Sequence, residues 1–191
     1  INIAISSRAK PGTYSIALRN KWGTTNISYP LVRRASPIGR YQGFDTRDVM
    51  YLITPDRFAN GDTTNDSIPD MIDTLDREAP YGRHGGDIQG IIGRLDYLKD
   101  LGVTALWMNP MVEDNASNAS YHGYAATDLY RIDPRFGTSE LYKKLVDEAH
   151  KRGLKIIMDH VNNHISINHP WIKNLPTPDW LNGTVENHPK V

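Results

Sequence analysis

The stretch that decides the fold is L-K-I-I-M-D-H-V-N-N-H, residues 154–164. Its apolar first part follows Gly153, a helix-terminating residue, and is typical of a strand that is buried on both faces. The run then changes to polar residues, which include Asp159, Asn163 and His164. Because the carboxyl ends of the strands hold the site in parallel α/β folds, these residues are candidates for chemistry. An ordinary strand exit with an Asx turn has the same composition, and this stretch alone does not separate the two.

Two earlier segments repeat this arrangement of an apolar strand followed by a polar loop. They are residues 49–54 and 103–108. Apolar residues at helical spacing separate the three strands, over 88–101 and 138–152, and each of these helices is followed by a glycine. Strands joined through helices imply parallel, right-handed βαβ units. The spacing fits either a doubly wound sheet or the first part of a (β/α)8 barrel, since a whole barrel needs roughly 250 residues.

Residues 1–33 have a different pattern, in which apolar and polar residues alternate over short runs. The candidate strands are residues 1–5, 14–18 and 27–32. Such runs, separated by Pro-Gly and Trp-Gly turns, are typical of antiparallel strands. Because three short strands make poor independent structure, we expect the end of an N-terminal β-sandwich, in a chain that begins inside a domain. The Pro and Gly content of residues 34–48 predicts a linker.

The composition excludes several classes of protein. Among 191 residues there are 22 Lys and Arg and 22 Asp and Glu, so the formal net charge is zero. A neutral chain without basic runs lacks the electrostatic features of a nucleic-acid-binding protein. The apolar runs are far too short for a membrane span, and no signal-peptide pattern precedes them. The absence of cysteine excludes disulfides and thiol chemistry but leaves the compartment open.

One polar loop is dense in side-chain oxygens. These oxygens belong to Asn60, Asp62, Asn65 and Asp66. Calcium takes roughly six to eight oxygen ligands from carboxylates, amides and backbone carbonyls, and Asp87 with the carbonyl of Gly85 could complete such a shell. So many protein oxygens suit calcium better than the smaller magnesium ion. The spacing is not that of an EF-hand, and a solvated Asx-rich turn explains the composition as well.

A second polar loop, Y-H-G-Y at residues 121–124, places aromatic side chains after the strand at 103–108. Tyr124 has an apolar ring and a polar tip, which suits stacking against a sugar. His122 and His164 could hydrogen-bond a ligand. Core packing of the tyrosine and satisfied packing of the histidines are the alternatives.

These motifs, in this order, resemble the α-amylase superfamily of glycoside hydrolases. D-H-V-N-N-H resembles the first signature of that superfamily, and H-G-Y-A-A-T-D-L-Y-R-I-D-P-R-F-G-T resembles the segment before its second barrel helix. P-D-R-F-A-N-G-D-T-T-N-D, together with G-G-D, resembles the calcium loop of the branch that acts on cyclodextrin and pullulan. The resemblance covers about residues 49–164 and is nearest to neopullulanases and cyclomaltodextrinases, which carry an N-terminal β-sandwich.

The resemblance implies a (β/α)8 barrel, whose first three strands would lie within residues 49–164, with an inserted domain that starts at 165–191. It implies a retaining glycoside hydrolase that cleaves α-1,4-glucosidic linkages in maltodextrin, pullulan or cyclodextrin. An α-glucan would be the partner, and a homodimer stays an open alternative. A polysaccharide substrate favours an extracellular or periplasmic location, but the sequence contains no signal that indicates export.

The resemblance also implies roles for the residues of the polar loops. Tyr124 would stack under the sugar at the cleaved linkage, and Asp159 would support the site. His122 and His164 would hydrogen-bond the hydroxyl groups of that sugar. The implied calcium ligands are Asn60, Asp62, Asn65, Asp66, Asp87 and the carbonyl of Gly85.

One departure from the family matters for the chemistry. A retaining glycosidase needs two carboxylates about 5–5.5 Å apart across the scissile bond, and the family carries its catalytic carboxylates after strands four, five and seven. None of the matching positions lies in these 191 residues, so we predict no turnover by this polypeptide alone. The alternatives are a transglycosylase of the same superfamily, a catalytically inactive carbohydrate-binding relative and a plain structural calcium module.

Overall fold

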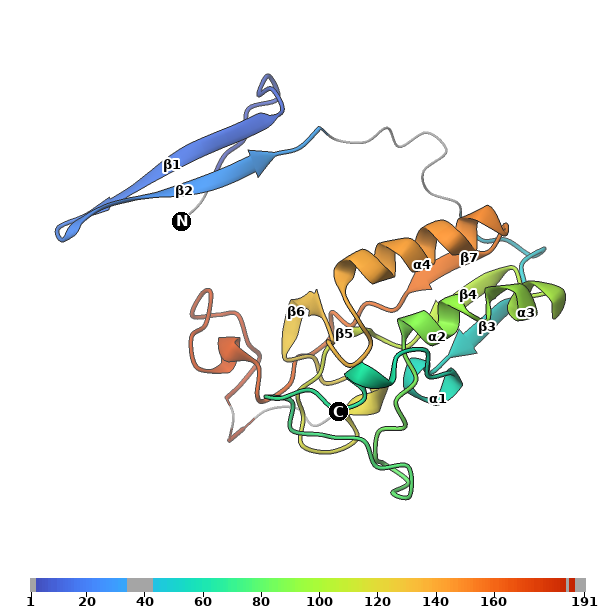
Figure 1. Ribbon diagram of the computed structural model, residues 1–191. Coiled ribbons are helices and arrows are strands. Elements are labelled where there is room, and N and C mark those ends of the chain that lie inside the picture. Colours follow the sequence, from blue (N-terminus) through green and yellow to red (C-terminus); the bar gives the residue numbers. More distant parts are fainter. Residues whose placement is uncertain (1–2, 34–42, 185, 188–191) are drawn as a thin grey trace. The chain divides into compact units, whose positions relative to one another are not determined.

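The computed structural model describes residues 3–33, 43–184 and 186–187. The chain divides into two compact units, Ile1–Gly43 and Phe44–Val191. The first unit holds two strands, and the second holds the parallel strands and the helices, as the ribbon in Figure 1 shows.

The first unit is a β-hairpin of β1 (Gly12–Asn20) and β2 (Gly23–Leu31), which pair antiparallel. The Asn20 side chain closes the turn, because its Oδ1 accepts hydrogen bonds from the backbone N–H groups of Trp22 and Gly23. Two of the three strands predicted in this region are therefore present, and both are longer than the alternating pattern indicated.

The strand predicted at residues 1–5 is not observed in the part of it that the structure describes. Residues 3–5 are irregular, and residues 1 and 2 lie outside the described residues. Alternation predicts a strand only where a partner strand can satisfy the backbone groups, and these residues find none in the part of the chain that the structure describes. Tyr14 and Ile27 of the hairpin are 45% and 48% exposed. An isolated hairpin of this kind is marginally stable in water, and the β-sandwich stays a prediction.

The second unit is built on three parallel strands in the order β3-β4-β7. Their bounds are Met50–Ile53 for β3, Ala105–Met108 for β4 and Lys155–Met158 for β7. The register places Ile53, Met108 and Met158 side by side, so the three strands end at the same level. The parallel arrangement that the sequence predicts is confirmed.

The helix α4 (Ser139–Lys151) connects β4 to β7 and packs along β7 (Figure 1). It begins where the Thr138 hydroxyl accepts a hydrogen bond from the Leu141 N–H at 3.1 Å, which satisfies one of the free donors of the first turn. Leu145 and Ala149 are completely buried on one face of the helix. The amphipathic helix predicted at this position is confirmed.

The connection from β3 to β4 contains two short helices, α2 (Ile88–Ile92) and α3 (Leu95–Asp100). The single helix predicted across this stretch is wrong, because it is interrupted at Gly93, a residue with low helix propensity. Gly90 has another role, since a Cβ atom there would lie 1.9 Å from the carbonyl oxygen of Ala59. The missing side chain lets α2 pack directly against the loop that carries the acidic and amide residues.

The sheet is buried on one face and exposed on the other. Ile53 and Leu106 point into a core shared with the helices and are almost completely buried. On the other face, Met50, Leu52 and Trp107 are 48%, 55% and 39% exposed. The expectation that these strands are buried on both faces is therefore not met within the described residues, because the helices cover only one side.

Short elements inside the polar loops were not predicted from the sequence. They are α1 (Pro55–Phe58), the two-stranded antiparallel sheet of β5 (Val112–Glu113) and β6 (Asp128–Ile132), and the 3₁₀ helices η1 (Thr63–Asn65), η2 (Ser120–His122) and η3 (Pro170–Ile172). All are too short to produce a periodic pattern, which needs a longer window than two to five residues.

The remaining predicted segments are partly described. Residues 34–42 of the linker lie outside the described residues, whereas Asp48, near its other end, accepts hydrogen bonds from Thr104 at 2.9 Å and from Lys155 at 2.7 Å. The segment predicted to start an inserted domain contains η3, and residues 185 and 188–191 are not described. Across the described ranges, no helix has the length and apolar character that crossing a membrane requires.

Candidate functional site

The candidate site begins with Asp159, which directly follows β7 at the carboxyl edge of the sheet. Its Oδ2 accepts two hydrogen bonds, from Tyr124 Oη at 2.9 Å and from Trp107 Nε1 at 3.1 Å. Burial, followed by the adjacent carboxylate, raises the pKa of the Tyr124 phenol above its usual value. The phenol therefore keeps its proton and acts as the donor, and 36% of the Tyr124 residue remains exposed.

His164 joins the same cluster through the backbone of Tyr124. Its Nε2 lies 2.8 Å from the Tyr124 carbonyl oxygen, and its Nδ1 lies 3.0 Å from Asn163 Nδ2. A carbonyl can only accept and an amide nitrogen can only donate, so these partners assign a neutral ring with the proton on Nε2. Both ring nitrogens are engaged in this arrangement.

His122 lies near the Tyr124 ring, with 5.7 Å between the two ring centroids. Its Nδ1 accepts a hydrogen bond from the Tyr124 backbone N–H at 2.9 Å, and this bond places the ring proton on Nε2. Burial lowers the pKa of His122, so the ring is neutral at pH 7 and its Nε2–H can donate.

The backbone between the two rings is tightly fixed. Gly123 has a positive φ of 75°, and a Cβ atom at this position would lie 2.0 Å from the carbonyl oxygen of Pro110. The Asn109 side chain also donates to the His122 carbonyl at 3.4 Å. The structure therefore brings together all four predicted substrate-binding residues, namely His122, Tyr124, Asp159 and His164.

The oxygen-rich loop is organised by Asp87, which is completely buried. Its carboxylate accepts hydrogen bonds from the backbone N–H groups of Gly61, Asp62 and Gly90, at 3.1, 2.8 and 2.6 Å. Asp62 in turn accepts from the backbone and side chain of Thr64. Two of the predicted metal ligands are thus engaged in holding the loop and the start of α2.

The amide oxygens of the same loop are in a different situation. Oδ1 of Asn60 and Oδ1 of Asn65 are buried, and neither has a hydrogen-bond partner within the described part of the chain. Asn60 Nδ2 donates to Asp66 Oδ1 at 2.6 Å, and a Cβ atom on Gly85 would lie 2.4 Å from the same carboxylate oxygen. Oxygens without donors suit a cation, because leaving a buried acceptor unpaired costs free energy.

The carboxylates do not complete a metal centre by themselves. Among the described residues, no three His, Cys, Asp or Glu side chains converge in a way that could hold a metal ion. The donor set that fits a cation is therefore the amide oxygens of Asn60 and Asn65 with the adjacent Asp66 and Gly85. Calcium accepts such neutral and charged oxygens together.

Sequence reasoning missed Trp107, which donates to Asp159 from the level of Leu52 and Ile157 in the sheet. The detectable signal was an indole inside an apolar strand next to the strand that ends in Asp159. It also missed the buried ions Asp56 and Arg83, which carried no sequence signal because single charged residues in a polar loop look solvated.

Comparisons with known proteins identify similar enzymes. The family described as alpha amylase, catalytic domain, matches residues 52–180. The chain is 47% identical over 120 residues to neopullulanase 2 of Thermoactinomyces vulgaris. The matched region covers 61% of this chain and 19% of that protein. It is also 41% identical over 131 residues to a cyclomaltodextrin glucanotransferase of Geobacillus stearothermophilus. This matched region covers 63% of this chain and 18% of that protein.

A solved structure is similar as well. The α-amylase of Geobacillus thermoleovorans, complexed with acarbose, matches with a TM-score of 0.58 and 40% identity, over 68% of this chain and 26% of that chain.

Three parallel strands end at one level, and a polar and aromatic cluster lies at their carboxyl ends. This arrangement is typical of α/β enzymes, whose active sites lie at that edge of the sheet. The chain belongs to the α-amylase family, in which the catalytic domain is a (β/α)8 barrel. The resemblance seen in the sequence is confirmed. The chain spans about a fifth of the length of the relatives named above.

Proposed function

We propose that the protein containing this chain is a retaining glycoside hydrolase that cleaves α-1,4-glucosidic linkages in maltodextrin, pullulan or cyclodextrin. The observation that carries the proposal is the cluster in which Tyr124, Asp159 and His164 are joined at the carboxyl edge of the sheet. In a retaining mechanism one carboxylate attacks and a second protonates the leaving oxygen. In our proposal the residues of this chain bind the sugar, and the two catalytic carboxylates are not among them.

The residues of the cluster would divide the work of binding. The hydrogen bond to Asp159 holds the Tyr124 ring in place, so the ring can stack on the apolar face of a glucose unit without losing side-chain freedom at that step. His122 would donate its Nε2–H to a hydroxyl group. His164 already uses both nitrogens, so a hydroxyl group would replace one of its present partners.

The test is the affinity for acarbose, measured by titration calorimetry on the full-length protein. We expect Tyr124→Ala to weaken binding about tenfold, which corresponds to about 1.4 kcal/mol, because the stacking surface is lost. Tyr124→Phe keeps the ring and should lose less than half of that free energy. The matched control is Tyr130→Ala, since Tyr130 is 85% exposed on β6. Wild-type affinity in Tyr124→Ala would refute the assignment.

A transglycosylase is the second candidate, because one relative named above is a glucanotransferase. The two activities share the glycosyl-enzyme intermediate and differ in whether water or an acceptor sugar attacks it. Product analysis with maltotriose separates them, since transfer produces oligosaccharides longer than the substrate and hydrolysis does not. Acarbose binding without either product would identify an inactive carbohydrate-binding relative instead.

We further propose that the oxygen-rich loop binds calcium through the oxygens of the amides and carboxylates. The central ligands of the proposed set are Asn60, Asn65, Asp66 and the carbonyl of Gly85; Asp62 and Asp87, whose oxygens also accept hydrogen bonds within the loop, complete it. What supports this is the pair of buried amide oxygens without hydrogen-bond donors. A bound cation would pair these oxygens and fix the loop against α2.

Removal of calcium should therefore lower the stability of the protein. At a free calcium concentration 100-fold above the dissociation constant, binding stabilises the folded state by about 2.7 kcal/mol. We expect chelation to lower the melting temperature of the wild type, and Asn65→Ala to weaken calcium binding at least tenfold by calorimetry. Asn26→Ala, in the separate hairpin, is the control. A calcium affinity that is equal in both variants would contradict the proposal.

A further inference from the structure

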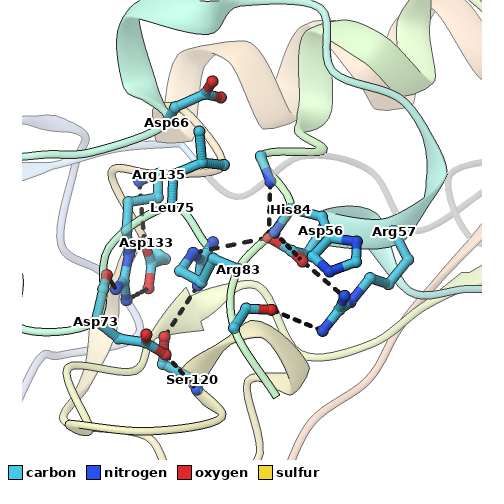
Figure 2. Close-up of polar contacts among 12 residues, drawn as sticks. Asp56, Arg57, Asp66, Asp73, Leu75, Arg83, His84, Ser120, Asp133 and Arg135 are labelled. Atoms are coloured by element: carbon cyan, nitrogen blue, oxygen red, sulfur yellow. Dashed lines mark hydrogen bonds and ion pairs between the residues drawn. The ribbon is translucent and has the colours of Figure 1, made fainter. Parts of the chain in front are cut away.

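Arg83 is one of the largest side chains that are fully buried, with 1% of the residue exposed. Its Nε lies 3.7 Å from Oδ1 of Asp56, and its Nη1 donates to the Ser120 hydroxyl at 3.1 Å (Figure 2). The guanidinium carbon is 4.7 Å from the centroid of the Phe136 ring. Nε and Nη2 have no hydrogen-bond partner among the residues that the structure describes. Burying an incompletely bonded guanidinium costs free energy, although the charges of the Asp133 and Asp56 carboxylates favour it.

On one side, Arg83 is connected to the oxygen-rich loop through Asp56. The Asp56 carboxylate accepts hydrogen bonds from the backbone N–H groups of His84 and Gly85, at 2.8 and 3.1 Å. Its carbonyl accepts from the N–H of Gly86 at 2.8 Å. Asp56 therefore fixes the peptide units that present the Gly85 carbonyl, which is one of the proposed calcium ligands.

On the other side, Arg83 is connected to the loop of residues 121–124, here called the aromatic loop, through Ser120, the first residue of η2. Ser120 is completely buried, and its backbone N–H donates to the Asp73 carboxylate at 3.0 Å (Figure 2). The Ser120 carbonyl accepts the Gly123 N–H at 3.2 Å. Since η2 ends at His122 and Gly123 is held against a backbone carbonyl, a shift of Ser120 would move the His122 ring.

We propose that Arg83 is a positioning residue that couples the two loops, so that calcium binding at one and sugar binding at the other strengthen each other. The path runs from the Gly85 peptide through Asp56 and Arg83 to Ser120, and from there along η2. This inference rests on the proposed function, because it assumes both ligands. Coupling between sites is reciprocal, so each ligand must raise the affinity of the other by the same factor.

The test uses full-length, calcium-free protein and two ligands, calcium chloride and acarbose, each titrated with and without the other. We expect calcium to tighten acarbose binding at least fivefold in the wild type, within the usual range of coupling, and acarbose to tighten calcium binding equally. Ser120→Ala removes one hydroxyl, and Arg83→Met removes the charge but keeps the stem. In both variants the coupling factor should fall below two.

The matched control is Arg152→Met. Arg152 pairs with Asp96 and Glu148 at the end of α4, so this change removes a guanidinium elsewhere and should leave the coupling unchanged. If Arg83→Met does not fold, Ser120→Ala decides, because it leaves the packing almost intact.

The possible failures are distinguishable. If wild-type protein binds no acarbose, the proposed sugar-binding function is wrong, and if it binds no calcium, the proposed calcium site is wrong. If both ligands bind but independently of one another, the coupling is refuted and the proposed function stands. If the variants are only less heat-stable and keep the wild-type coupling factor, Arg83 has a purely structural role and the inference is overturned.

Discussion

At the scale of single residues, Gly123 shows how closely the aromatic loop is fitted. Its positive φ of 75° is a conformation that other residues adopt only with strain, and a Cβ atom would meet the Pro110 carbonyl at 2.0 Å. Neither the strain nor the contact can be relieved by a flexible side chain, because the neighbouring atom belongs to the backbone. The rings of His122 and Tyr124 on either side of it therefore keep a fixed separation.

Gly123→Ala should destabilise the protein by about 3 kcal/mol, from the left-handed conformation, which costs roughly 1–2 kcal/mol, and from the contact with Pro110. Gly102→Ala is the matched control, since Gly102 also has a positive φ, of 88°, but has no atom within 4 Å of the added carbon. The control should lose only the conformational part. Urea denaturation of both variants measures the difference. An equal loss of unfolding free energy in the two variants would mean that the loop shifts to avoid the contact with Pro110.

Asp114 gives a prediction about pH. Burial raises its pKa to about 6, although hydrogen bonds from the N–H groups of Ala125 and Ala116 act in the opposite direction. The folded state thus binds a proton more tightly than the unfolded state, where the pKa is near 3.8. This contribution to stability is complete below about pH 3.8 and is lost as the pH rises through about 6.

We therefore expect the melting temperature of the wild type, relative to that of Asp114→Asn, to fall by roughly 5–10 °C between pH 4 and pH 7. The comparison between the two proteins cancels the other titrating groups. A difference in melting temperature that stays constant over this range would show that Asp114 does not carry the effect.

At the scale of elements, the predictable parts were those with a long enough pattern. The apolar runs of β3, β4 and β7 and the periodic face of α4 identified these elements. The sequence did not predict the break at Gly93 or the two-residue strand β5, because a period cannot be measured over so few residues.

The oxygen-rich loop illustrates a second limit of sequence reasoning. Composition identified Asp87 as a candidate ligand but could not show that its carboxylate caps α2 and accepts from Gly61 and Asp62. Which backbone N–H groups surround a carboxylate depends on how the loop folds against the helix. The cluster of Tyr124 and Asp159 was easier to predict, because parallel strands must end at the same edge of the sheet.

Removal of the cap of α4 tests how much that element depends on its first turn. Thr138→Ala loses the hydrogen bond to the Leu141 N–H and should lower the free energy of unfolding by about 1 kcal/mol. Thr138→Ser keeps the hydroxyl and should stay within about 0.5 kcal/mol of the wild type. Urea denaturation measures both, and a loss in the serine variant as large as in the alanine variant would assign the effect to the methyl group instead.

At the scale of the whole molecule, the exposed face of the sheet and the missing carboxylate pair lead to one prediction. Met50, Leu52 and Trp107 leave one side of the strands uncovered within the described residues, and such a surface tends to associate. Asp159 is hydrogen-bonded to Tyr124 and Trp107, and the family resemblance implies a supporting role for it, not a catalytic one. We expect the isolated 191-residue polypeptide to self-associate and to release no reducing sugar from maltodextrin, whereas the full-length protein releases it. Size-exclusion chromatography and a reducing-sugar assay measure the two properties, and turnover by the purified polypeptide would show that this chain contains catalytic groups we have not recognised.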